Sequence, residues 1–167
     1  MEEIQFIEKG ESKNCLLLIH GFCSGPEDWK DQIKFFCTDY TVLVPTLRGH
    51  DGNNHKNRPM SIKQLSNDCV TILNKKSFSR VVIAGHSMGT RLAIDIASKI
   101  KNAAGLILVD GSRFCDYETY FEVLSNFENS LKQNNYQSQL KNMFLSMFFS
   151  ESYKKDRDRI VKRAVNI

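Results

Sequence analysis

The sequence lacks any apolar run of the roughly 18 residues that a membrane-spanning helix requires. Its longest apolar stretches, such as residues 16–19, have the length of a β-strand. Residues 1–4 also lack the basic-then-apolar pattern of a secretion signal, so we expect a cytoplasmic protein with no membrane partner. With 167 residues and only 3 prolines, the chain has the length of one domain with a sizeable core.

Paired cysteines and a basic face are missing as well. The five cysteines are scattered singly with no C-x-x-C pair, which argues against a disulfide framework and a structural zinc site. The net charge is +4, and much of the excess lies in residues 151–167, where opposite charges are interleaved. This distribution is typical of a solvated helix, so we expect no nucleic-acid partner. The H-E-x-x-H, G-x-G-x-x-G and Walker motifs are also absent, so no metal or organic cofactor is expected.

Apolar strands alternate with helix-length segments through the first two thirds of the sequence. The expected strands are 3–8, 14–20, 41–44, 80–84 and 104–109, and the expected helices are 26–36, 61–75 (capped by Ser61) and 88–100. This alternation predicts βαβ units and a mostly parallel sheet with helices on both faces, which is the α/β class. Residues 116–163 instead have a wholly helical pattern with an apolar cluster at 143–149, so we expect the sheet to end before them.

One motif carries the chemistry. Residues 85–89 read Gly-His-Ser-Met-Gly, which fits G-x-S-x-G, and they lie between a predicted strand and a predicted helix, as a nucleophile elbow requires. The turn would hold Ser87 in a strained conformation, with its hydroxyl at the carboxyl edge of the sheet. Side chains at Gly85 and Gly89 would collide with the neighbouring strand and helix. A surface turn with a capping serine is the alternative, and it explains neither glycine.

Further segments resemble the α/β-hydrolase superfamily in their order and spacing: residues 18–22, Trp29, 47–50 and 84–89. The resemblance covers about residues 3–112. It implies an α/β-hydrolase core at 1–112, truncated at its C-terminal side, followed by a helical lid or cap segment at 113–167.

The resemblance also implies the roles of individual residues. Ser87 would attack a small ester or thioester, with a small acyl compound as the partner, and the backbone N–H groups of Phe22 and Met88 would form the oxyanion hole. His20 and the segment 48–50 would shape the loops around the site. The run 20–29 is similar to the subgroup that contains SHCHC synthase, so a lyase of that type is an alternative.

The sequence departs from the family where the catalytic base should be. The family order is serine, acid, histidine, but no histidine follows Ser87; the four histidines are 20, 50, 55 and 86. Three explanations stay open: the chain is the amino-terminal part of a longer hydrolase, it is a non-catalytic scaffold that binds a ligand, or His50 or His55 serves as the base. The isolated chain is expected to be catalytically impaired.

Two expectations follow for the strand at 104–109. Asp110 comes directly after it, where some family members place their acid, but with no histidine to orient, we expect Asp110 to cap the loop. The strand itself would be an open apolar edge of the sheet, and such edges recruit other chains. We therefore expect self-association through this edge.

Overall fold

The structure is a computed structural model, and it describes residues 4–50, 60–111, 125–126, 128–130, 132–148 and 150–166. The chain divides into two compact units, Met1–Ser112 and Arg113–Ile167. None of the helices in the described residues is both long and apolar enough to cross a membrane.

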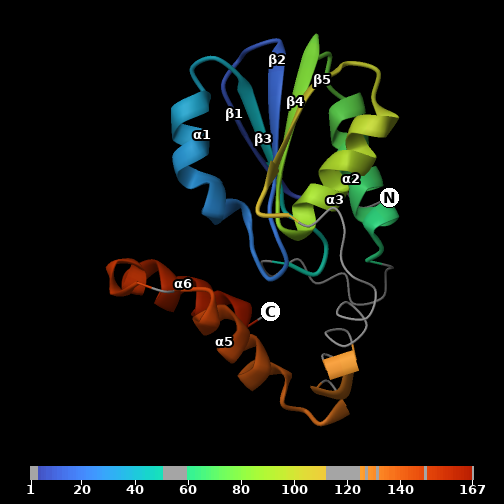
Figure 1. Cartoon of the computed structure of the whole chain (residues 1–167). Helices are drawn as coiled ribbons and strands as arrows, with labels where there is room; N and C mark the ends of the chain where they lie inside the picture. Colours follow the sequence, from blue (N-terminus) through green and yellow to red (C-terminus); the bar gives the residue numbers. More distant parts are fainter. Residues whose placement is uncertain are drawn as a thin grey trace. The chain divides into compact units, whose positions relative to one another are not determined.

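A single five-stranded sheet forms the centre of the first unit (Figure 1). Its strands in chain order are β1 (Phe6–Lys9), β2 (Asn14–Ile19), β3 (Thr41–Pro45), β4 (Arg80–His86) and β5 (Ala103–Val109). Their order in the sheet is β1-β3-β2-β4-β5, and β1 alone runs antiparallel to its neighbour. The predicted α/β class and the mostly parallel sheet are confirmed.

Helices cover both faces of this sheet (Figure 1). A 3-10 turn, η1 (Pro26–Trp29), and helix α1 (Lys30–Phe36) lie on one face, whereas α2 (Ile62–Asn74) and α3 (Met88–Lys99) lie on the other. The predicted single helix over 26–36 is therefore two pieces, because Trp29 has φ −100° and ψ 9° and leaves the helical region.

Alternate residues of the central strands supply the two cores, since successive side chains of a strand point to opposite faces. Leu17 and Ile83 belong to the core beneath α2 and α3, whereas Leu16 and Leu18 belong to the core beneath α1. In α3, Gly89 and Ala93 are buried and Ala97 packs against the first core, so the stripe of small residues lets this helix approach the sheet closely.

Helix α2 begins where the sequence predicts, because Ser61 caps it. The Ser61 hydroxyl accepts a hydrogen bond from the backbone N–H of Gln64, with an N···O distance of 3.2 Å. We expect Ser61→Ala to lower the free energy of unfolding by about 1 kcal/mol, measured by urea denaturation. Ser98→Ala is the control, because this exposed serine bonds only to Asp95 within α3 and should change stability by less than about 0.5 kcal/mol. Equal losses in both variants would contradict the capping role.

The second unit contains α5 (Tyr136–Ser146), a 3-10 turn η2 (Glu151–Tyr153) and α6 (Lys154–Ala164). Helices α5 and α6 pack together, and each buries two side chains: Leu140, Phe144, Val161 and Ala164. The expectation of a wholly helical segment is wrong at residues 133–135, 147–148 and 150, where the described chain is not helical. The side chains of the apolar cluster at 143–149 are not buried together: Phe144 is buried, whereas Met147 is 55% exposed.

Candidate active site

The turn between β4 and α3 holds Ser87 in an unusual conformation. Its φ is 51° and its ψ is −118°, and the side chain is exposed to solvent. The Ser87 N–H donates to the carbonyl of Val109 at 2.9 Å, which fixes the turn against the end of β5. The Ser87 hydroxyl makes no capping hydrogen bond to α3. A capping serine therefore does not explain this turn.

The two glycines of the motif are required by close backbone packing. A Cβ atom on Gly85 would lie 2.2 Å from the carbonyl oxygen of Gly89 in α3. A Cβ atom on Gly89 would lie 2.5 Å from the carbonyl oxygen of Ile19 in β2. The predicted collisions with the neighbouring helix and strand are confirmed, and they explain how α3 begins directly against the sheet.

The loop that follows β2 lies beside this turn. A Cβ atom on Gly21 would be 3.2 Å from the Ser87 Cβ and 3.2 Å from the His86 Nδ1. Phe22 follows immediately and is 46% exposed. The backbone of Phe22 and the first residue of α3, Met88, thus belong to the two segments that meet at Ser87. The first N–H groups of any helix have no partner within it, so this corner is suited to an anion.

His20 is fixed between the ends of two strands. Its side chain is fully buried, its Nδ1 lies 3.0 Å from the carbonyl oxygen of Gly21, and the Leu47 N–H donates to its Nε2 at 3.2 Å. The carbonyl can only accept, so Nδ1 carries the proton and Nε2 accepts. Both ring nitrogens are occupied by backbone groups. His20 therefore orders the loops, as the resemblance implies, and cannot serve as a base.

His50 lies beside the same loop. Its ring centroid is 5.2 Å from that of His20 and 6.2 Å from that of Phe22, both in edge contacts. Its Nδ1 is 2.9 Å from the carbonyl oxygen of Arg48, to which it donates. These contacts support the loop rather than the hydroxyl of Ser87. His55, the other base candidate, lies outside the described residues.

An ion pair that sequence reasoning missed anchors the segment 48–50. The Arg48 guanidinium donates two hydrogen bonds to the Asp68 carboxylate, Nε to Oδ2 and Nη2 to Oδ1, the latter at 2.8 Å. The two side chains are only 4% and 11% exposed. Gln64 adds a third bond to this carboxylate. The loop after β3 is thereby tied to α2, and no local sequence signal pairs residues 20 positions apart.

Asp110 lies next to the turn at Ser87, because the register of β4 and β5 places Val109 opposite His86. Its φ is 48°, a left-handed conformation that aspartate tolerates better than most residues. Across the described parts of the chain, its carboxylate makes no hydrogen bond or ion pair. The loop that Asp110 would cap continues from residue 112 into a part of the chain outside the described residues, so the capping role stays a prediction.

Most thiols of the first unit are inert. Burial, with a smaller contribution from Asp68, raises the pKa of Cys69 to about 12, and burial together with Glu8 raises that of Cys15 to about 12. Both therefore stay protonated at neutral pH. Cys23 is 2% exposed, and Cys115 lies outside the described residues. Within the ranges that the structure covers, no cluster of three His, Cys, Asp or Glu side chains could hold a metal ion.

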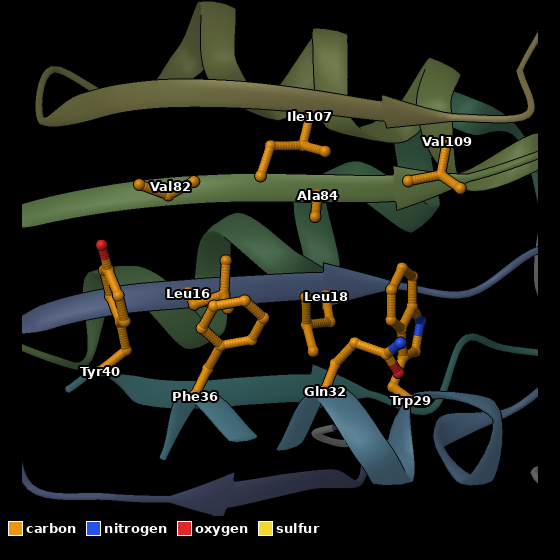
Figure 2. Close-up of a pocket in the computed structure, with 10 residues that line it drawn as sticks. All are labelled: Leu16, Leu18, Trp29, Gln32, Phe36, Tyr40, Val82, Ala84, Ile107 and Val109. Atoms are coloured by element: carbon orange, nitrogen blue, oxygen red, sulfur yellow. The ribbon is translucent and has the colours of Figure 1, made fainter. Parts of the chain in front are cut away.

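An apolar groove of about 360 Å³ runs along the α1 face of the sheet (Figure 2). Strand residues Leu16, Leu18, Val82, Ala84, Ile107 and Val109 form its floor, and Trp29, Gln32, Phe36 and Tyr40 form its wall. The Trp29 Nε1 is buried and has no hydrogen-bond partner among the described residues. Val109, which accepts the Ser87 N–H, lies at one end, so the groove runs toward the turn.

Comparison with known proteins places these features in one family. The sequence model described as "Alpha/beta hydrolase family" matches residues 16–160. Among curated proteins, epoxide hydrolase 3 of Xenopus tropicalis is 29% identical over 119 residues, which cover 67% of this chain and 32% of that protein. The chain thus matches about a third of the length of this relative.

Solved structures share the fold. A thermophilic esterase from Thermogutta terrifontis superposes with a TM-score of 0.80 at 23% identity, covering 98% of this chain and 60% of that one. MenH from S. aureus superposes with a TM-score of 0.66 at 18% identity, covering 99% of this chain and 69% of that one. At these identities the likeness concerns the fold.

Proposed function

The chain belongs to the alpha/beta hydrolase family, and we propose that it carries the nucleophile of a serine hydrolase acting on small esters or thioesters. The observation that carries this proposal is the conformation of Ser87. The residue is held at positive φ on a strand-to-helix turn, and its side chain is exposed. Its hydroxyl makes no capping hydrogen bond to α3. This is the arrangement that a nucleophile elbow needs.

In the proposed reaction, the Ser87 oxygen adds to the carbonyl carbon of the substrate and its proton passes to a base. The carbonyl electrons move to the oxygen, and the N–H groups of Phe22 and Met88 stabilise that negative charge. Collapse of this intermediate breaks the bond to the alcohol or thiol, which leaves with a proton. Water then cleaves the acyl-enzyme and restores the serine. Loss of one oxyanion-hole donor costs about 10²–10³-fold in kcat in a serine protease of another fold.

Among the described residues, no histidine is hydrogen-bonded to the Ser87 hydroxyl. His20 is bonded at both nitrogens, and no histidine follows Ser87 in the 167 residues. This observation favours a second candidate function, a scaffold that binds an acyl or aromatic ligand without turnover. Ligand binding that survives Ser87→Ala, with no turnover in either form, would distinguish the scaffold from the hydrolase.

The hydrolase proposal predicts that a fluorophosphonate probe adds once to the chain, as measured by intact mass, and that the adduct disappears in Ser87→Ala, whereas the scaffold predicts no adduct in either form. The reason is that only a serine with an exposed, activated hydroxyl reacts with such probes at a useful rate. Ser98→Ala is the matched control, because Ser98 is also exposed but bonds within α3, and it should keep the adduct. A folded chain that takes up no probe would contradict the hydrolase proposal and favour the ligand-binding scaffold. Weak ester turnover would not decide the matter, because a broken triad can retain about 10³–10⁴-fold acceleration.

A further inference from the structure

The ring of Phe22 packs against a buried neighbour. The His50 ring meets it edge-on, with the two centroids 6.2 Å apart and the planes at 84°. This is a favoured geometry for a pair of aromatic rings. Phe22 is 46% exposed, whereas His50 is only 7% exposed. Because the buried ring is the more fixed of the two, His50 limits where the Phe22 ring lies, and with it the Phe22 backbone N–H.

His50 in turn depends on the backbone of the two residues that precede Gly49. Its Nδ1 donates to the Arg48 carbonyl oxygen at 2.9 Å, and its backbone N–H donates to the Leu47 carbonyl oxygen at 3.1 Å. Leu47 is fully buried in the first core, so packing fixes it. The Arg48 guanidinium is held by the Asp68 carboxylate in α2. The ion pair therefore helps to set the position of the His50 ring.

We propose that Asp68 is a positioning residue, which fixes the backbone N–H of Phe22 through Arg48 and His50. The contacts from α2 to Phe22 do not depend on the proposed function, but the use of that N–H as an oxyanion donor rests on it. A donor that is displaced by a remote change stabilises the oxyanion less, and a misplacement of about 1 Å can cost 10²-fold in rate. Asp68 would thus act on the reaction without touching the substrate.

Helix α2 offers a matched control for Asp68. Ser66 lies two residues earlier, is fully buried, and hydrogen-bonds to Asp95 and Lys99 of α3, the latter at 2.9 Å. At 3.6 residues per turn, Ser66 and Asp68 lie about 200° apart around the helix, so one side chain meets α3 and the other meets Arg48. Ser66→Ala therefore removes buried hydrogen bonds of α2 but leaves the proposed chain of contacts intact.

The first test observes the Phe22 amide by NMR, at a temperature at which circular dichroism shows every variant folded. Phe22 is the only one of the 11 phenylalanines that follows a glycine, so isotope labels at the glycine carbonyl and the phenylalanine nitrogen select its signal alone. Asp68→Asn keeps the side-chain volume but removes the charge and one acceptor, and it should shift or split this signal. Arg48→Lys, which cannot donate two parallel bonds, should do the same. Ser66→Ala should leave the signal in place.

The second test asks whether the effect passes through His50. His50→Ala removes the ring that contacts Phe22 and should itself displace the amide signal. Adding Asp68→Asn to His50→Ala should then cause little further change, because the chain of contacts is already broken. Displacements that simply add would show that the two residues act independently.

The third test is the rate at which a fluorophosphonate labels Ser87, because the phosphonyl oxygen occupies the place of the oxyanion. We expect labelling to be about tenfold slower in Asp68→Asn and to stay within about twofold in Ser66→Ala. A parent chain that takes no label would refute the proposed function, and the amide signal would still decide the positioning role. The proposal is overturned by a Phe22 signal that ignores Asp68→Asn, that moves equally in Ser66→Ala, or that responds undiminished beside His50→Ala. Equal labelling of the parent chain and Asp68→Asn would overturn it as well.

Discussion

Gly89→Ala is expected to lower the melting temperature of the chain by about 5 °C or more. Alanine in a helix normally stabilises by up to about 1 kcal/mol relative to glycine, so propensity alone predicts a gain. Here the added Cβ would lie 2.5 Å from the carbonyl oxygen of Ile19 and 2.8 Å from that of His20. Both atoms are backbone at the carboxyl end of β2 and cannot easily move aside, so α3 would have to shift. Such overpacking costs about 3 kcal/mol, which exceeds the gain.

The matched control for this substitution is Gly105→Ala in β5. Its Cβ would lie 3.6 Å from the nearest atoms of Val82, an ordinary van der Waals distance. We expect a change of less than about 1 kcal/mol in the free energy of unfolding. Thermal unfolding followed by circular dichroism compares the two variants. Similar melting temperatures for both would show that α3 does not depend on the close approach at Gly89.

Asp68→Ala is expected to cost about 3 kcal/mol in the free energy of unfolding. The substitution removes both hydrogen bonds that Asp68 accepts from Arg48, whose guanidinium is only 4% exposed. Removing one partner of a buried ion pair is strongly destabilising, because the remaining charge stays buried. Because the pair is buried, added salt should change this loss little.

The control for Asp68 is Glu8→Ala, which breaks a pair with Lys76 whose side chains are about one third exposed. Exposed pairs contribute roughly 0–1 kcal/mol and weaken with salt. Urea denaturation at low and high ionic strength measures both variants. A loss at Asp68 no larger than that at Glu8 would mean that the loop after β3 does not need its link to α2.

Features set by neighbouring residues were predictable from the sequence. The cap at Ser61 and the steric need for Gly85 and Gly89 depend on short segments, and the structure confirms them. The alternation of strands and helices likewise predicts the α/β class. The helical pattern after residue 116 predicts that the sheet ends with the strand at 104–109, and β5 is the last strand in the order of the described sheet.

Features set by contacts between distant segments were not predictable. The hydrogen bond between Arg48 and Asp68 joins a loop to a helix 20 residues later, and the sequence around each residue gives no sign of its partner. The direction of β1 also escapes a periodicity argument, because alternation has the same form in parallel and antiparallel strands. The interruption at Trp29 lies in its backbone angles, and its ring packs in the second core among strand residues that are distant in the sequence.

Three residues other than glycine have a left-handed backbone beyond the carboxyl ends of β2, β4 and β5: Cys23, Ser87 and Asp110, with φ of 53°, 51° and 48°. Each such residue costs about 1–3 kcal/mol relative to an unstrained conformation, and glycine would relieve much of that cost. Selection of random variants for heat resistance alone would therefore tend to replace Ser87 by glycine. A variant of this chain selected only for stability would lose the hydroxyl of Ser87, so stability competes with the proposed nucleophile for the same backbone position.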